Sequence, residues 1–223
     1  MSRNRDEVRA RIAEVGVIAG IRVSSPEDAL FAAESVASGG IPIVELTMTV
    51  PGALEVISHL VENGPQLIVG AGSVWDVETA RRCLDAGAAF LTTTGLDLKI
   101  VEFAVHENVV IFPGALTPSE VMTAWKAGVD FVKIFPCSQM GGAPYIRTLK
   151  APFPQISLIA SGGVNQLNVA EFFLAGASAV GVGAHLIPKK AVELRQSHRI
   201  RELAVRLAGT VGEVRKQSHP RKP

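Results

Sequence analysis

A lysine and a glutamate lie inside short apolar segments, where such residues are rare. Lys133 is at the centre of segment 131–135 (FVKIF) and Glu45 at the centre of segment 43–47 (IVELT). Lysine is almost never fully buried unless it is paired or functional. Desolvation favours the neutral amine, which is the form that attacks a carbonyl to give a Schiff base. We predict that Lys133 is this nucleophile; a strand-end lysine that reaches solvent, or one in a plain ion pair, is the alternative.

Glu45 is the only acidic residue within the predicted strands. A carboxylate close to a buried amine can exchange protons with it, so Glu45 is the predicted acid/base partner, with a structural salt bridge as the alternative. Arg22 ends segment 17–21 and could hold a substrate carboxylate, because a guanidinium binds a carboxylate through two parallel hydrogen bonds. A lone arginine at a strand end is also common at surfaces and interfaces.

Three glycine clusters follow predicted strands: Gly70-Ala71-Gly72-Ser73, Ser161-Gly162-Gly163 and Gly181-Val182-Gly183-Ala184. Glycine lets backbone amides approach an anion closely, so these loops predict an anion site, and tight turns are the alternative. The 5 histidines form no close cluster with acids or cysteines, so no metal site is predicted. Cys137, Trp75 and Trp125 are predicted to be packing residues.

The elements around these residues alternate between strand and helix. Short apolar segments recur about two dozen residues apart, at 17–21, 43–48, 67–69, 90–93, 109–112, 131–135, 156–160 and 179–182. Amphipathic segments such as 26–38, 77–85, 118–126 and 167–174 lie between them. Ser25 and Thr117 precede prolines as helix caps, and glycine-containing segments such as Ala127-Gly128-Val129 end helices.

This alternation predicts an α/β fold, a single-domain (β/α)8 TIM barrel, with a leading helix over residues 1–14 and closing helices over residues 192–216. The predicted domain is 1–216, and residues 217–223 are predicted to be a disordered tail. An open doubly wound sheet is the alternative, although no Gly-x-Gly-x-x-Gly follows the first strand. In a barrel, alternate strands fill the same interior layers, so Glu45 on strand 2 and Lys133 on strand 6 can face each other. Loops after strands 7 and 8 are the usual phosphate site of this fold.

Composition excludes several classes of function. The chain has 223 residues, enough for one such barrel, and 48% of them are hydrophobic. The formal net charge of +1 predicts neither a nucleic-acid nor a membrane partner. No apolar stretch reaches the roughly 18 residues of a membrane span, and the charged first fifteen residues contain no signal-peptide core. The 2 cysteines show no metal-ligand spacing, and a cytoplasmic location is expected.

These segments together resemble the 2-keto-3-deoxy-6-phosphogluconate (KDPG) aldolase / 4-hydroxy-2-oxoglutarate (KHG) aldolase family. The resemblance extends from about residue 16 to residue 188. The matching segments are Gly20-Ile21-Arg22, Ile43-Val44-Glu45-Leu46-Thr47, Gly70-Ala71-Gly72-Ser73, Phe112-Pro113-Gly114, Val132-Lys133-Ile134-Phe135-Pro136, Ser161-Gly162-Gly163-Val164 and Gly181-Val182-Gly183.

The resemblance implies a class I aldolase that uses neither metal nor cofactor, acts on a small keto acid and assembles as a homotrimer. Lys133 would form the pyruvate Schiff base and Glu45 would transfer protons. The remaining implied site residues bind substrate, namely Arg22, Thr49, Gly72, Ser73, Pro113, Phe135 and Ser161, or the phosphate, namely Gly162, Gly163, Gly183 and Ala184. Thr49 occupies a position where several relatives carry a substrate-binding arginine.

The chain departs from the family at Thr93-Thr94-Gly95, where Ser-Pro-Gly is usual, and at Ser73 and Ser161, where threonine is common. Ala184 replaces a phosphate-binding serine. The expected reaction is cleavage of KDPG to pyruvate and glyceraldehyde 3-phosphate. The alternatives are an aldolase or decarboxylase of unphosphorylated keto acids, and a non-catalytic barrel that binds a phosphorylated metabolite.

Overall fold

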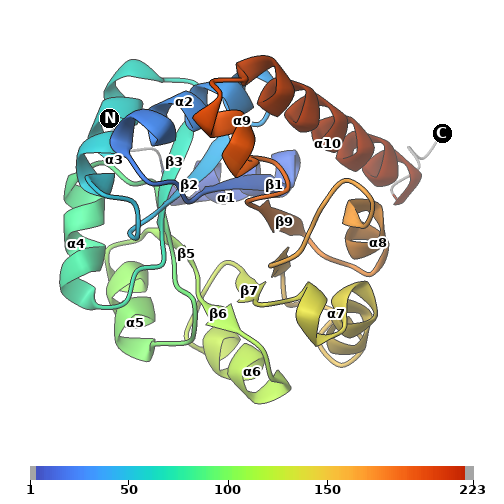
Figure 1. The fold of residues 1–223 in the computed structure, drawn as a ribbon. Helices are drawn as coiled ribbons and strands as arrows, with labels where there is room; N and C mark the ends of the chain where they lie inside the picture. Colours follow the sequence, from blue (N-terminus) through green and yellow to red (C-terminus); the bar gives the residue numbers. More distant parts are fainter. Residues whose placement is uncertain (1–3, 219–223) are drawn as a thin grey trace.

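The computed structural model describes residues 4–218, which form a parallel β-barrel surrounded by helices (Figure 1). The strand order is β5-β4-β3-β2-β1-β9-β8-β7-β6, and all paired neighbours are parallel. The predicted TIM-barrel class is confirmed.

The strands are β1 (Val17–Ile21), β2 (Ile43–Thr47), β3 (Ile68–Gly72), β4 (Phe90–Thr92), β5 (Val110–Phe112), β6 (Gly114–Ala115), β7 (Val132–Ile134), β8 (Leu158–Ser161) and β9 (Ala179–Val182). The helices are α1 (Arg5–Val15), α2 (Pro26–Ser38), α3 (Ala53–Asn63), α4 (Val77–Asp85), α5 (Leu98–His106), α6 (Pro118–Lys126), the 3₁₀ helix η1 (Ser138–Met140), α7 (Gly142–Lys150), α8 (Val169–Leu174), α9 (Lys189–Glu193) and α10 (Ser197–Ser218).

The fifth predicted strand, 109–112, corresponds to β5, and the short strand β6 follows it beyond Pro113 without having been predicted. Strand β5 pairs with β4, whereas β6 pairs with β7. Proline has no N–H to donate to a strand ladder, so the chain changes partners around this residue. Residues 4–218 therefore contain nine strand segments at eight barrel positions, because β5 and β6 share the fifth position.

Helix α1 closes the amino-terminal end of the barrel. Its Val8 and Ile12 are fully buried and belong to one apolar cluster with the residues that begin the barrel's inner face, among them Ile18, Ile43 and Phe90. The predicted leading helix is thus present over Arg5–Val15, and residues 1–3 lie outside the described part of the chain. Since this end is filled, a substrate can reach the interior only from the carboxyl ends of the strands.

Local sequence signals place the helices around the barrel. The Ser25 hydroxyl accepts the Asp28 N–H, and Thr117 forms a reciprocal capping box with Glu120 at the start of α6. After α6, Gly128 has a φ of 88°, a left-handed conformation that most other residues avoid. These contacts confirm the predicted helix starts and ends.

The carboxyl-terminal helix α10 packs on the outer layer of helices. Helix α10 packs against α2 and α8, and Arg215 donates to the carbonyl oxygens of Glu14 and Ser178 while its guanidinium lies 4.9 Å from the Phe173 ring centroid. Helix α10 continues through Ser218, two residues beyond the predicted boundary at Lys216, and the rest of the predicted tail, 219–223, lies outside the described residues. Within residues 4–218, no helix is long and apolar enough to cross a membrane.

Candidate active site

Strand β7 directs the Lys133 side chain into the barrel. Phe131, two residues earlier on the same face, belongs to the apolar cluster of the barrel interior. The Lys133 N–H donates to the Pro113 carbonyl over 2.9 Å on one side, and Lys133 is in register with Ile159 of β8 on the other. The residue is only 7% exposed. The sequence-based prediction of a buried lysine in a strand is confirmed.

Glu45 reaches the same depth from β2. It is also 7% exposed, and its Oε1 lies 3.6 Å from the Lys133 Nζ. The Glu45 carboxylate has room because Gly72 of β3, which lies beside it, has no side chain. A Cβ added to Gly72 would lie 2.1 Å from the Glu45 Oε1, which is far inside any contact distance. The pair predicted from alternate strands is therefore brought together, at the separation of an ion pair.

Thr92, the last residue of β4, is a third polar side chain at this level, and the sequence analysis missed it. It is 0% exposed, and its Oγ1 accepts a hydrogen bond from the Lys133 Nζ over 3.2 Å. Threonine is common in strands because its branched side chain suits them. A buried threonine in a strand therefore gave no signal of a polar contact with Lys133.

The predicted carboxylate-binding residues lie nearer the mouth of the barrel. Arg22 is exposed at the end of β1, and its Nη2 donates to the Ser73 Oγ over 3.4 Å. Ser73 follows β3 with a φ of 57°. The Thr49 hydroxyl, exposed after β2, is 2.9 Å from that of Thr47. Arg22 and Ser73 are therefore brought together as a pair of donors, one charged and one neutral.

The predicted anion-binding loops follow β8 and β9. Gly162 and Gly163 have φ values of 90° and 81°. A Cβ on Gly163 would lie 2.5 Å from that of Ser138, so glycine is required there for space as well as for conformation. Gly183 begins the turn after β9, and Ala184 is exposed beside it. Gly162 and Gly163 thus adopt a left-handed conformation that favours glycine, and anion binding by these loops stays a prediction.

All three glycine clusters extend into strands, which corrects their placement after strands; Ser161 is the last residue of β8. Gly70, Ala71 and Gly72 lie within β3, and Gly181 lies within β9. The reason is steric: a Cβ on Gly70 would lie 2.2 Å from the Phe90 ring, and one on Gly181 would lie 2.8 Å from the Ser161 Oγ. These glycines make room for side chains on neighbouring strands, so part of the pattern that predicted loops reflects packing inside the barrel.

Aromatic and thiol groups border the site. The Phe135 ring centroid is 5.6 Å from the Lys133 Nζ. Cys137 is fully buried just beyond, and burial raises the pKa of its thiol to about 12. Burial likewise raises the pKa of the Cys83 thiol to about 11. Both thiols are therefore protonated at neutral pH, as the prediction of a packing role for Cys137 requires.

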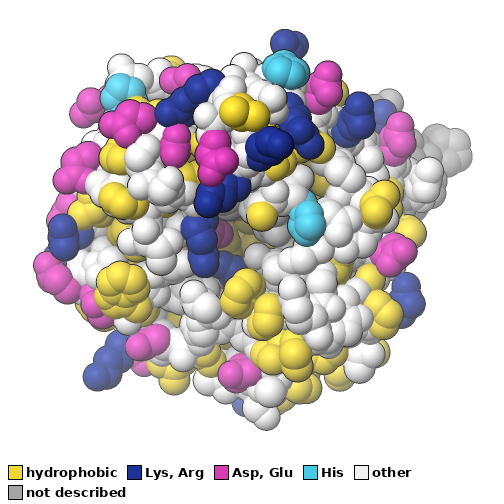
Figure 2. Space-filling view, in the orientation of Figure 1, with side chains coloured by type: hydrophobic (Ala, Val, Ile, Leu, Met, Phe, Trp, Pro, Cys, Tyr) yellow, Lys and Arg dark blue, Asp and Glu magenta, His cyan; other side chains and the backbone are white. Residues whose placement is uncertain are grey.

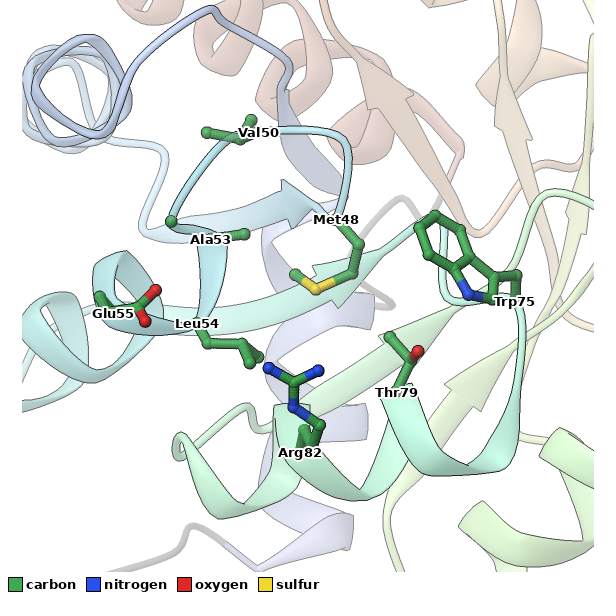
Figure 3. A pocket seen from close by; sticks show the side chains of 9 residues that line it. Met48, Val50, Ala53, Leu54, Glu55, Trp75, Thr79 and Arg82 are labelled. Atoms are coloured by element: carbon green, nitrogen blue, oxygen red, sulfur yellow. The ribbon is translucent and has the colours of Figure 1, made fainter.

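The molecular surface is hollowed near the middle of the face shown in Figure 2, with Lys or Arg side chains at the rim. A separate surface pocket of about 340 Å³ lies to one side, between the loop after β2 and helix α4 (Figure 3). Met48, Trp75 and Arg82 line it, but neither Lys133 nor Glu45 does, so this pocket is not the site of the amine chemistry. Trp75 was predicted to be a packing residue, but it is 62% exposed at the edge of this pocket.

Within residues 4–218, no group of three His, Cys, Asp or Glu residues could hold a metal ion.

Comparison with known proteins gives a consistent result. The model of the KDPG and KHG aldolase family matches residues 8–203. The 2-dehydro-3-deoxy-phosphogluconate aldolase of Pseudomonas aeruginosa is 32% identical over 195 residues, which cover 85% of this chain and 88% of that protein. The KDPG aldolase of Legionella pneumophila, solved with pyruvate captured as a covalent carbinolamine, superposes with a TM-score of 0.83 at 29% identity, covering 89% of this chain and 97% of that one. A chain of a porous protein cage, designed by fusing symmetric oligomeric domains, superposes with a TM-score of 0.83 at 30% identity, over 92% of this chain and 75% of that one.

Proposed function

The chain belongs to the KDPG and KHG aldolase family, and we propose that it cleaves KDPG to pyruvate and glyceraldehyde 3-phosphate through a Schiff base on Lys133. It is an aldolase and therefore a lyase. One observation above all supports this assignment of the nucleophile. The Lys133 amine is buried inside the barrel with a carboxylate oxygen 3.6 Å away, at the end that is open to substrate.

The first half of the reaction attaches the keto acid to Lys133. The neutral amine attacks the C2 carbonyl carbon, and the carbonyl π electrons move to oxygen, which takes up a proton. Glu45, within reach of the nitrogen, accepts the proton that the nitrogen releases and returns one to the C2 hydroxyl as it leaves as water. The resulting iminium is the electron sink that the cleavage step needs.

The second half breaks the bond between C3 and C4. Glu45, directly or through a water, takes the proton of the C4 hydroxyl, and the C3–C4 electron pair moves into the iminium to leave an enamine of pyruvate. The aldehyde departs. Protonation of the enamine at C3 and addition of water to the iminium then release pyruvate and restore the free amine.

The other predicted residues hold the two ends of the substrate. Arg22 and Ser73, which contact each other, bind the C1 carboxylate. Around it, further contacts come from Thr49, Gly72, Pro113, Phe135 and Ser161. The glycine loops at Gly162, Gly163 and Gly183, with Ala184, receive the phosphate through backbone amides, which do not depend on side-chain identity.

A second substrate class is favoured by one feature of the anion loop. Ala184 is exposed there and has no hydroxyl to offer a phosphate. The family includes KHG aldolases, so we propose that unphosphorylated 4-hydroxy-2-oxo acids are also cleaved. Paired measurements of kcat/KM on KDPG and KHG decide which of them the enzyme prefers.

We also propose that the enzyme is a cytoplasmic homotrimer. The structural similarity to a chain from a cage built of symmetric oligomeric domains supports self-association. An exposed indole at Trp75 offers apolar surface for a contact between copies. Two buried free thiols suit a reducing compartment. Light scattering with size-exclusion chromatography measures the mass and tests the trimer.

Borohydride trapping tests the proposed function. Incubation with pyruvate and sodium borohydride should add one reduced pyruvate to the protein, and peptide mass spectrometry should locate it on Lys133. Lys133→Arg should take up no label and show no turnover, because a guanidinium stays protonated. Lys150, whose amine donates hydrogen bonds to the carbonyls of Pro154 and Ile156, serves as the control position. Labelling of Lys150 with Lys133 unmodified would overturn the assignment.

A further inference from the structure

Thr92 is the closest polar neighbour of the Lys133 amine among the described contacts, at 3.2 Å against 3.6 Å for Glu45. It enters from β4, whereas Glu45 enters from β2. These strands and β7 occupy alternate barrel positions, the second, fourth and sixth, which contribute side chains to the same interior layer. The amine is thus approached by one carboxylate and one hydroxyl from two different strands.

The contact with Lys133 is the main hydrogen bond of the Thr92 hydroxyl. A buried hydroxyl needs a hydrogen-bond partner. Apart from Lys133, the partner of the Thr92 hydroxyl is the Thr93 carbonyl, to which it donates over 3.5 Å, the outer limit of hydrogen bonding. The side chain two residues earlier on the same face is Phe90, in the apolar interior cluster. A hydroxyl at this depth is unnecessary for packing, because valine has the same shape.

We propose that Thr92 is a positioning residue that orients the Lys133 amine for Schiff-base formation, an inference that rests on the proposed function. A neutral amine has two N–H bonds and one lone pair. When one N–H is directed at the Thr92 Oγ1 and the other at the Glu45 carboxylate, rotation about the Cε–Nζ bond stops and the lone pair points away from both. That leaves it facing an incoming C2 carbonyl.

A hydroxyl suits this role better than a second carboxylate. Another negative charge beside the amine would favour the ammonium form, which cannot attack a carbonyl. The threonine oxygen accepts a hydrogen bond from the amine without adding a full charge. Glu45 can therefore exchange protons with the nitrogen while Thr92 keeps the nitrogen in place.

The test compares variants with and without the hydroxyl. Thr92→Val keeps the shape, and Thr92→Ser keeps the hydroxyl. Ser35→Ala removes a buried hydroxyl from α2 as a matched control, since the Ser35 hydroxyl donates to the Phe31 carbonyl of its own helix, far from Lys133 in the sequence. The rate of Schiff-base formation is measured by rapid-quench borohydride trapping with pyruvate, and kcat and KM by KDPG cleavage.

We expect Thr92→Val to slow trapping and lower kcat by about two- to tenfold, the change that corresponds to one hydrogen bond, with KM within about twofold. Thr92→Ser should recover most of the rate, and Ser35→Ala should match the parent enzyme. If Thr92→Val fails to fold, Thr92→Ala takes its place. Parent-like trapping in the folded variant, or a serine variant as slow as valine, would overturn the inference alone. Failure of the parent enzyme to be trapped at Lys133 would overturn the proposed function as well.

Discussion

Replacing Gly72 by alanine should separate Glu45 from Lys133 without changing either residue. The added Cβ would lie 2.1 Å from the Glu45 Oε1 and 2.6 Å from its Cδ, whereas ordinary contact begins at 3.4 Å. The carboxylate must therefore move by about 1 Å, and a displacement of that size in a reacting group can cost about 100-fold in rate. We expect exchange of the pyruvate C3 protons with deuterium, followed by NMR, to slow by about this factor.

Gly70→Ala is the matched control, because it adds the same methyl group to the same face of the same strand. The three atoms nearest to its Cβ would all belong to the Phe90 ring, the closest at 2.2 Å, whereas those nearest to a Cβ on Gly72 belong to Glu45. Both variants should lose stability, by about 1–3 kcal/mol for an overpacked interior, as measured by urea unfolding. Only Gly72→Ala should lose exchange out of proportion to stability. Equal loss of exchange in the two variants, or parent-like exchange in Gly72→Ala, would refute the reasoning.

Three further outcomes are expected. Glu45→Gln should slow pyruvate C3 exchange by about 10²–10⁴-fold, the usual worth of a positioned general base, while borohydride labelling persists; near-normal exchange would reduce Glu45 to a structural partner. Ala184→Ser should raise kcat/KM for KDPG by about fivefold, the value of one added hydrogen bond, and leave KHG cleavage unchanged; no change on either substrate would mean that this turn does not bind phosphate. The third concerns Cys137, whose pKa is raised to about 12 by burial. Between about pH 9 and pH 11 the unfolded thiol ionises and the folded one does not, so stability should fall with rising pH by at most about 1.4 kcal/mol per unit. Urea unfolding of Cys137→Ala across this range should show a shallower decline, and an identical slope would contradict the assignment.

The barrel could be predicted because its signals are local and repeated. Each signal depends only on residues that are neighbours in the sequence. These signals are the regularly spaced apolar segments, the caps at Ser25 and Thr117 and the helix-ending glycines. The short strand β6 was not predicted, although Pro113 marks the place where it begins. A proline excludes one ladder bond, but whether the chain then stops or changes partners depends on β4 and β7, which are distant in sequence.

The candidate site was predictable where a residue conflicts with its surroundings. Lys133 and Glu45 are charged residues within apolar segments, and charge in such a position needs an explanation. Thr92 creates no such conflict, and its role follows only from the position of the Lys133 amine across the barrel. The glycines of β3 were noticed, but their packing role was not predicted. Gly70 and Gly72 are small because Phe90 and Glu45 occupy the space beside them, a relation between strands that a single segment cannot reveal.

The amino-terminal helix has a consequence for the order of events in turnover. Because Val8 and Ile12 fill one end of the barrel, both products must leave through the same opening. If the glycine loops bind the phosphate as proposed, Lys133 lies below them, and pyruvate is held deeper than the aldehyde. Glyceraldehyde 3-phosphate can depart while pyruvate is still attached, but the reverse is blocked. Steady-state kinetics should then be ordered, with pyruvate as a competitive inhibitor against KDPG and the aldehyde as a noncompetitive one.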